Sequence, residues 1–390
     1  DAMGHTATFE YDTVGNLTAT VDPLGNRSER TYDAVSRLIA TKDPKGAITR
    51  FAYDAVDRLV TLMDALGAVT NFTYDPTGNP LTVTDARGNT TSHEYDARNR
   101  LSKRTDPLGR IETYAYDFNG NLRTVTDRKG QVTMHTYDSL NRRVRSDYAD
   151  GTSITYEYDP TGKLLTATDS QTGATTNTFD PLGRLTAQVT SQGAISYAYD
   201  PLSRRQTMQV NGVEPVIYGY DANSRLTQLQ RGTQTVTLVY DPADRRTTLT
   251  LPNGVTTTST YDSASRLTAL TYTGPGGPLG DLRYSYDAAG NRTATGGTSA
   301  RTGIPTSIPP SSYDAANRQL AFGPTTQTFD ANGKLLTQTD ATGTTTYTWD
   351  ARNRLTGISG PTVTATFAYD AFGRRMTKTT WEFASGRRPP

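Results

Sequence analysis

Residues Phe9–Asn26 read FEYDTVGNLTATVDPLGN, and close copies of this stretch recur along the whole chain. A pair formed by an aromatic residue and Asp begins at residues 11, 32, 53, 74, 95, 116, 137, 158 and 179, which is a strict period of 21 residues. The pair returns at 199, 220, 240, 261, 286, 313, 329, 349 and 369, so the chain holds 18 copies. Such a period is typical of repeat proteins, in which each unit stacks on its neighbours.

Each copy contains two turn signals, which in the first copy are Asp12–Gly15 and Asp22–Gly25. Asp suits the first position of a tight turn because its carboxylate accepts hydrogen bonds from nearby backbone N–H groups. The residue four after the aromatic is Gly, Asn, Asp or Ser in all 18 copies, as a turn with a left-handed residue requires. We therefore expect both turns to reverse the chain.

The six or seven residues between the turns have the usual length of a β-strand. They alternate in polarity, and with one bulged residue counted, Tyr11 should lie opposite Leu17. We expect Leu17, Ala19 and Val21 to share one face of the sheet. Each repeat is thus predicted to form one β-hairpin, and 18 repeats to form about 36 antiparallel strands.

The predicted fold is all-β, a single array of antiparallel hairpins over residues 1–380 that forms a spiral, hollow shell-like or tube-like sheet. The array is expected to be irregular between about 273 and 312, where TGPGGPLG (273–280) and the Gly/Pro/Ser-rich stretch 296–312 read as loops at hairpin ends. Residues 381–390 are expected to form a flexible tail.

The residues predicted to matter are the structural positions of the repeat, and no catalytic, cofactor-binding or metal-binding residue is predicted. They are Tyr11, Asp12, Gly15, Asp22, Gly25, Tyr32, Asp33, Tyr53, Asp54, Tyr74, Asp75, Tyr95, Asp96, Tyr116, Asp117, Tyr137, Asp138, Tyr158 and Asp159.

Composition excludes several classes of protein. The chain has no Cys, which rules out disulfides and thiolate chemistry. With 40 basic and 39 acidic residues its net charge is +1, so we expect no nucleic-acid partner. No apolar run approaches the length of about 18 residues that a membrane span needs.

The polar residues that could suggest a site have a structural explanation. Asp22 and its counterparts every 21 residues resemble a calcium ladder, but each has a turn to cap and no neighbouring acidic ligand. His93 and His135 replace an aromatic two residues before the Tyr, and His5 falls in a turn. We therefore expect no metal ion and no general base.

Two rows of side chains leave alternatives open. The tyrosines could pack between strands or, if exposed, stack on sugar rings. The basic residues beside the first turn could pair with the Asp of the following repeat or simply be solvated. These basic residues are Arg37, Arg58, Arg100, Arg142 and Arg184.

The stretches YDTVGNLTATVDPLGN, YDAVSRL, YDARNRL and YDAFGRR resemble the Rhs/YD-repeat family, which includes shells of bacterial Rhs and Tc-type toxins and of animal teneurins. The resemblance covers residues 1 to about 380. It implies a β-strand shell that spirals around a cavity, which in the toxin members holds a cytotoxic polypeptide. The self-cleaving region of those toxins has no counterpart after Trp381, so the resemblance transfers no protease residues.

We expect a non-catalytic wall, secreted or at the cell surface, that forms part of a shell enclosing a toxin or effector polypeptide. The alternative is an extracellular fibre or adhesin in which copies join head to tail, with carbohydrate bound by tyrosine rows. An enzyme acting on polysaccharide would need two carboxylates at one unique site, and no such pair stands out. No cofactor is expected.

Overall fold

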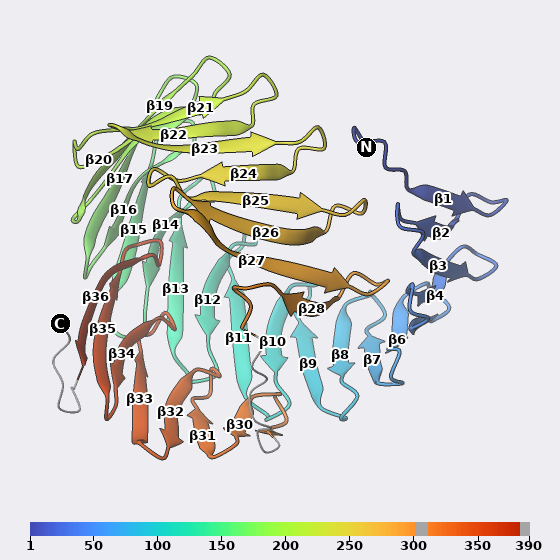
Figure 1. Cartoon of the computed structure of the whole chain (residues 1–390). Helices are drawn as coiled ribbons and strands as arrows, with labels where there is room; N and C mark the ends of the chain where they lie inside the picture. The colour runs from blue at the N-terminus through green and yellow to red at the C-terminus, as the bar shows by residue number, and fades with distance from the viewer. Residues whose placement is uncertain (302–310, 383–390) are drawn as a thin grey trace. The chain divides into compact units, whose positions relative to one another are not determined.

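The computed structural model describes residues 1–301 and 311–382 of the 390-residue chain (Figure 1). Those ranges contain 36 strands and no helix, which confirms the all-β prediction and the predicted number of strands. The described residues accordingly include no helix that could cross a membrane. The predicted tail at 383–390 and the residues 302–310 of the predicted loop lie outside the described ranges.

The first sheet contains 28 strands, β1 to β28. The first fourteen are β1 (Thr8–Tyr11), β2 (Leu17–Val21), β3 (Arg27–Tyr32), β4 (Leu38–Lys42), β5 (Ile48–Tyr53), β6 (Leu59–Met63), β7 (Val69–Tyr74), β8 (Pro80–Thr84), β9 (Thr90–Tyr95), β10 (Leu101–Thr105), β11 (Ile111–Tyr116), β12 (Leu122–Thr126), β13 (Val132–Tyr137) and β14 (Arg143–Asp147). The next fourteen are β15 (Ser153–Tyr158), β16 (Leu164–Asp169), β17 (Gly173–Phe179), β18 (Leu185–Thr190), β19 (Gly193–Tyr199), β20 (Arg205–Val210), β21 (Val216–Tyr220), β22 (Leu226–Arg231), β23 (Gln234–Tyr240), β24 (Arg246–Thr250), β25 (Thr256–Tyr261), β26 (Leu267–Gly274), β27 (Gly277–Tyr286) and β28 (Arg292–Gly296).

The second sheet contains eight strands. They are β29 (Ser312–Tyr313), β30 (Gln319–Phe322), β31 (Thr325–Phe329), β32 (Leu335–Asp340), β33 (Gly343–Trp349), β34 (Leu355–Ser359), β35 (Val363–Tyr369) and β36 (Arg375–Glu382). In both sheets the strands pair in antiparallel fashion with their neighbours in sequence, as a succession of hairpins (Figure 1).

The register of each hairpin shifts by one residue beside the aromatic-Asp pair. In the first hairpin Tyr11 pairs with Leu17 as predicted, but Glu10 pairs with Ala19. Residues directly opposite each other share a face, so Ala19 lies on the face of Glu10 and not with Leu17. The prediction that Leu17, Ala19 and Val21 share one face is therefore wrong, because the bulged residue moves the rest of the strand by one position.

The stretch 273–280 is more regular than predicted. Strands β26 and β27 extend into it, with Tyr272 opposite Gly280 and Gly274 opposite Gly277. Only Pro275 and Gly276 remain between the two strands, so the expected loop is a tight hairpin end. A register shift between Tyr272 and Thr273 absorbs the extra residue.

The structure divides into two compact units, and each unit combines two separate stretches of the chain. Unit 1 consists of residues 1–72 and 197–304, and unit 2 of residues 73–196 and 305–390. Among the described residues, fully buried apolar side chains are few, and a buried cluster in unit 2 is formed by Ile154, Ala167 and Ala371. The aromatic and Leu side chains are mostly half-buried, as expected for a sheet whose strands cover one another.

Candidate functional site

The aromatic-Asp turn is the polar feature that recurs in every repeat, and the Asp33 turn shows its geometry. The Asp33 Oδ1 atom accepts the backbone N–H groups of Val35 at 3.0 Å and of Arg37 at 2.9 Å. The Asp33 Oδ2 atom accepts the side-chain Nε–H of Arg37 at 2.7 Å. Between them Ser36 has a φ of 65°, in the left-handed region. The carboxylate is thus fully used in holding its own turn.

The left-handed position is a property of every copy. The residue four after the aromatic has a positive φ in all 18 copies, from 58° at Asn99 to 96° at Gly78. This confirms the expectation drawn from the Gly, Asn, Asp and Ser residues at that position. The second turn uses the same geometry, with Gly25 at a φ of 83° and Asp22 accepting the N–H groups of Leu24 and Asn26.

Hydrogen bonding keeps these carboxyl groups ionised. The side chain and backbone N–H of Arg100 lower the pKa of Asp96 to about 2, against an ordinary value of about 3.9. Burial alone would raise the pKa of Asp75, but hydrogen bonds from Asn79 and Thr77 lower it to about 2. A carboxylate held ionised in this way is a turn cap, and it is poorly suited to act as a general acid.

Neighbouring repeats are joined by an aromatic ring and a guanidinium group. The Arg100 guanidinium lies over the Tyr116 ring, 4.4 Å from its centroid, and Arg100 Nη1 donates to the Asp117 carbonyl oxygen at 3.5 Å. The Tyr116 hydroxyl in turn donates to the Leu101 carbonyl oxygen at 3.0 Å. These two repeats are thus tied together by contacts that bypass the backbone ladder.

The hydroxyl bond recurs with the same spacing. The acceptor is always the residue six after the preceding aromatic. The pairs are Tyr32–Leu17, Tyr53–Leu38, Tyr95–Pro80, Tyr116–Leu101, Tyr137–Leu122, Tyr158–Arg143, Tyr220–Arg205, Tyr240–Leu226, Tyr261–Arg246, Tyr286–Leu267 and Tyr369–Leu355. Sequence reasoning missed this bond, although the preference for Tyr over Phe at this position is a signal for it.

The structure places the predicted repeat residues in two roles. The aspartates accept backbone N–H groups of their own turns, namely Asp12, Asp22, Asp33, Asp54, Asp75, Asp96, Asp117, Asp138 and Asp159. Tyr32, Tyr53, Tyr95, Tyr116, Tyr137 and Tyr158 donate to the preceding repeat, whereas Tyr11 in β1 is 61% exposed. Tyr74 ends β7, and Gly15 and Gly25 are left-handed.

Two of the open alternatives now have an answer. The arginines pair with the Asp of their own repeat, as Arg37 does with Asp33 at 2.7 Å, while the following repeat supplies a backbone carbonyl and a ring. Where the following repeat has an Asp at its left-handed position, the arginine pairs with that residue as well, as Arg37 does with Asp57 at 2.7 Å and Arg225 with Asp244 at 2.8 Å. The tyrosine hydroxyls are engaged within the sheet, so the proposal of sugar binding gains no support.

The histidines and acidic groups form no evident metal site. Burial lowers the pKa of His135, whose Nδ1 lies 2.9 Å from the Ser146 hydroxyl oxygen, and burial likewise lowers the pKa of His93. His5 lies beside Asp1 at 3.2 Å. Among the residues that the structure describes, no three His, Cys, Asp or Glu side chains are grouped as metal ligands would be.

Unit 2 also contains contacts between turns that lie about 200 residues apart in sequence. The aromatic-Asp turns of residues 314–373 dock on the second turns of residues 85–172, and we call this contact the turn seam. Arg87 Nη1 donates to Asn317 Oδ1 at 2.9 Å, and Asn332 Nδ2 donates to Asp127 Oδ2 at 2.6 Å. Thr172 Oγ1 donates to the Tyr369 carbonyl oxygen at 3.0 Å. Sequence periodicity carries no signal for these long-range contacts.

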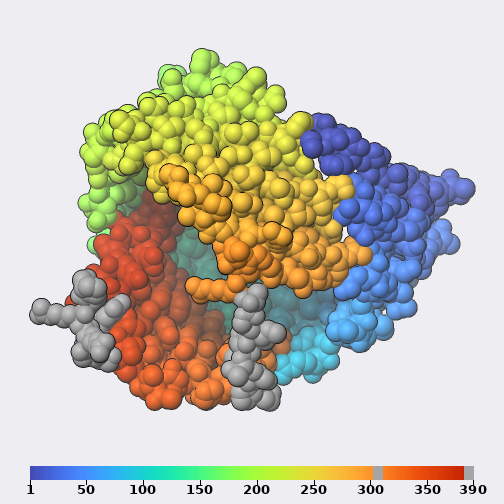
Figure 2. All heavy atoms as spheres, in the orientation of Figure 1, coloured from blue at the N-terminus to red at the C-terminus, as the bar shows by residue number. Residues whose placement is uncertain are grey.

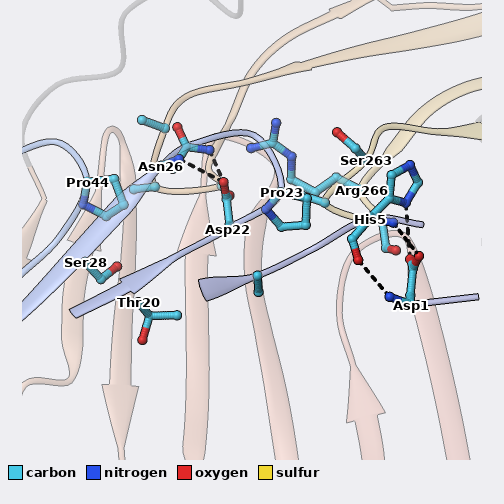
Figure 3. Close-up of a pocket in the computed structure, with 16 residues that line it drawn as sticks. Asp1, His5, Thr20, Asp22, Pro23, Asn26, Ser28, Pro44, Ser263 and Arg266 are labelled. Atoms are coloured by element: carbon cyan, nitrogen blue, oxygen red, sulfur yellow. Dashed lines mark hydrogen bonds and ion pairs between the residues drawn. The ribbon is translucent and has the colours of Figure 1, made fainter. Parts of the chain in front are cut away.

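Unit 1 brings together its own two stretches in a similar way. Lys45 Nζ lies 2.9 Å from Asp287 Oδ2, and in Figure 2 the blue N-terminal atoms meet the yellow and orange ones. A cavity of about 530 Å³ lies between the turns, with Asp22, Asn26 and Arg266 among its lining residues (Figure 3). Figure 3 shows Asn26 hydrogen-bonded to Asp22, so these polar groups serve the turn.

Models of two families of repeats match parts of the chain. A model of the teneurin YD-shell matches residues 68–211, and a model of the RHS repeat matches residues 32–69, 220–256, 240–277 and 329–362. No curated protein matches the chain.

Solved structures share the fold. The crystal structure of TcdB2-TccC3 aligns with a TM-score of 0.75 and 15% identity over 99% of this chain and 27% of that chain. TcdB2-TccC3-Cdc42 aligns with a TM-score of 0.68 and 14% identity over 95% of this chain and 28% of that chain. The Photorhabdus luminescens Tc holotoxin pore aligns with a TM-score of 0.58 and 15% identity over 92% of this chain and 23% of that chain. This chain thus spans about a quarter of the length of those chains and shares their hairpin fold. Its matched stretches carry the repeats of the Rhs/YD-repeat family.

Proposed function

We propose that this chain is a non-catalytic wall segment of a secreted or cell-surface shell that encloses a toxin or effector polypeptide. The observation that carries the proposal is the use of the recurring polar groups. The Asp carboxylates cap turns, the arginines tie one hairpin to the next, and the tyrosine hydroxyls bond to the preceding strand. Chemistry that is repeated at every hairpin builds a surface, whereas catalysis needs a unique constellation.

A wall of this kind suits confinement for a physical reason. Each hairpin is fixed to its neighbours by hydrogen bonds that do not depend on a large apolar core. Such a sheet can separate an inner space from solvent while remaining only one layer thick. An enclosed polypeptide would then be shielded from proteases without any reaction carried out by the wall.

The likeness to this family supports the same function. The matching models describe shell repeats, and the solved structures with this fold are Tc toxin assemblies. The partners that we propose are accordingly proteins, either the enclosed polypeptide or further copies of a repeat array. The fibre or adhesin alternative predicts head-to-tail filaments instead.

Electron microscopy and protease protection together test the proposal. We expect negative-stain images of the purified protein to show hollow particles or curved walls, and a tagged unstructured polypeptide fused after residue 390 to be cleaved more slowly than the same polypeptide alone. Long filaments would favour the fibre. Solid particles combined with equal cleavage rates would contradict the enclosing role.

A further inference from the structure

The repeats alone do not determine which turn docks on which in the turn seam of unit 2. Four similar turns dock on a row of similar turns, mostly through backbone carbonyls, Asn side chains and turn aspartates. A shift by one hairpin would present nearly the same groups again. Periodic surfaces of this kind slip unless a non-periodic contact fixes one alignment.

One hexapeptide occurs twice in unit 2 and behaves differently in its two places. Residues 96–101 and 350–355 both read DARNRL. In the first copy Arg98 is exposed and donates to the Phe118 carbonyl oxygen of the next hairpin at 2.9 Å. In the second copy the Arg352 side chain is only 8% exposed and forms an ion pair with Asp169, whose side chain is completely buried. Because the local sequence is the same, the surroundings must decide the difference.

The residues that receive Arg352 include one departure from the repeat, Tyr148, and one Asp that follows the repeat, Asp169. Arg352 Nη2 donates to Thr152 Oγ1 at 3.0 Å, and its guanidinium lies 4.3 Å from the centroid of the Tyr148 ring. Tyr148 stands where seven earlier copies have Asp, at Asp1, Asp22, Asp43, Asp64, Asp85, Asp106 and Asp127. Asp169 caps its turn with Oδ1, which accepts the Gln171 N–H at 2.9 Å, and Oδ2 remains for Arg352.

We propose that the Arg352–Asp169 pair fixes the register of the turn seam, with Tyr148 and Thr152 as the site that admits the guanidinium. A docking shifted by one hairpin would bury the Arg352 charge without Asp169 and leave Asp169 buried without a partner. Burying an unpaired charge is far more costly than the small differences between similar turns. The pair therefore selects one alignment among several near-equivalent ones, whatever the wall encloses.

Hydrogen exchange measured by mass spectrometry tests the contact in the full chain. In Arg352→Gln the backbone amides of segments 148–153 and 350–354 should exchange ~100-fold faster, because removal of Arg352 leaves the buried Asp169 carboxylate without its counter-charge. Asp169→Asn should give the same pattern. The matched control is Arg98→Gln, which alters the same hexapeptide outside the seam and should leave both segments unchanged. Unchanged exchange in Arg352→Gln would overturn the proposal.

A crosslink distinguishes register from stability. The chain has no Cys, and Arg374 Nη1 lies 2.8 Å from Gln188 Oε1 across the seam, so Q188C/R374C reports alignment through a flexible bismaleimide. In the double variant D169N/R352Q neither charge is stranded, and folding should survive. The crosslink should nevertheless be lost from a large part of the molecules. If the crosslink yield equals that of Q188C/R374C with Arg352 and Asp169 intact, the seam keeps its register without these two residues, and the proposal is wrong.

Discussion

Trp349 donates a hydrogen bond from its indole Nε1 to the Leu335 carbonyl oxygen, 2.8 Å away. This is the bond that tyrosine hydroxyls make in eleven other repeats, with an acceptor at the same place in the preceding hairpin. A different ring with a different donor atom thus preserves the same link. The repeat position favours a flat apolar ring that ends in a donor, and Tyr is the usual residue that meets both needs, whereas Phe179 and Phe329 supply the ring alone.

Truncation of Tyr116 should separate the two parts of this preference. Tyr116→Phe keeps the ring under Arg100 and loses one hydrogen bond, so we expect a loss of about 0.5–1.5 kcal/mol. Tyr116→Ala also removes the half-buried ring and should cost ~3 kcal/mol or more. Urea denaturation followed by tyrosine fluorescence and circular dichroism measures both. Equal effects of the two variants would mean that the ring itself contributes nothing.

The left-handed position of the turn gives a second prediction. Gly120 has a φ of 93°, and a β-branched residue is strained there, so Gly120→Val should destabilise the protein by about 1–2 kcal/mol. Gly120→Asn is the matched control, because Asn99 and Asn141 occupy the same turn position at φ values of 58° and 60°. The parent protein should have the highest melting temperature, Gly120→Asn one close to it and Gly120→Val the lowest. A Val variant as stable as the Asn variant would contradict the assigned turn.

Replacement of arginine beside the turn by lysine should weaken the turn. Arg100 donates Nε–H to Asp96 Oδ2 at 2.8 Å while its guanidinium lies 4.4 Å from the Tyr116 ring centroid. Lys163, at the same position of another repeat, lies farther from both partners, with Nζ 3.8 Å from Asp159 Oδ2 and 6.0 Å from the Phe179 ring centroid. We expect Arg100→Lys to cost about 1 kcal/mol, as one lost side-chain hydrogen bond does. Arg98→Lys, two residues away on the exposed side of the same turn, should cost less. Equal melting temperatures for the two variants would argue against a specific role of the guanidinium.

Acid should weaken the array through its turn caps. Hydrogen bonds lower the pKa of Asp85, Asp96 and Asp287 to about 2, below the value of ~3.9 expected in the unfolded chain. A folded pKa below the unfolded one stabilises the protein above pH ~4, and this stabilisation is lost as the pH falls toward 2. Burial also lowers the pKa of His93 and His135, so a smaller loss should begin below pH ~6.5.

Melting temperatures recorded between pH 7 and pH 2 check this profile. The main fall should lie below pH 4, and Asp96→Asn should be less stable than the parent at pH 7 but lose less on acidification. A melting temperature that stays constant down to pH 2 would mean that the caps contribute nothing to stability.

Much of the fold was accessible from the sequence because its determinants are local. Each aromatic-Asp turn is specified by an Asp and a left-handed residue within five positions, and the predicted pairing of Tyr11 with Leu17 follows from them. The sequence did not predict which face of the sheet Ala19 lies on, because a single bulged residue moves every later side chain of the strand to the opposite face. The loop expected at 273–280 does end a hairpin, but it is shorter than its glycines suggested, because Gly274 and Gly277 belong to the ends of two long strands.

The links across the sheet were less accessible. The pairing of Arg37 with Asp33 of its own turn was not among the expected options, whereas its second pairing with Asp57 of the following repeat was, since spacing alone does not tell whether a guanidinium turns back or forward. The turn seam was out of reach, because Arg98 and Arg352 share the same neighbours in sequence and differ only in what the fold brings beside them. Contacts set by the path of the sheet cannot be read from a repeating pattern.

The Arg352–Asp169 contact restricts how many hairpins can lie between these two residues. Duplication or loss of a whole 21-residue unit leaves every local bond intact, so single hairpins are easy for evolution to add or remove. Between these two residues, however, the number of hairpins is fixed, because one more or one fewer would carry Arg352 past its acid. Changes in repeat number within that interval should therefore occur only together with a relocated acid-base pair.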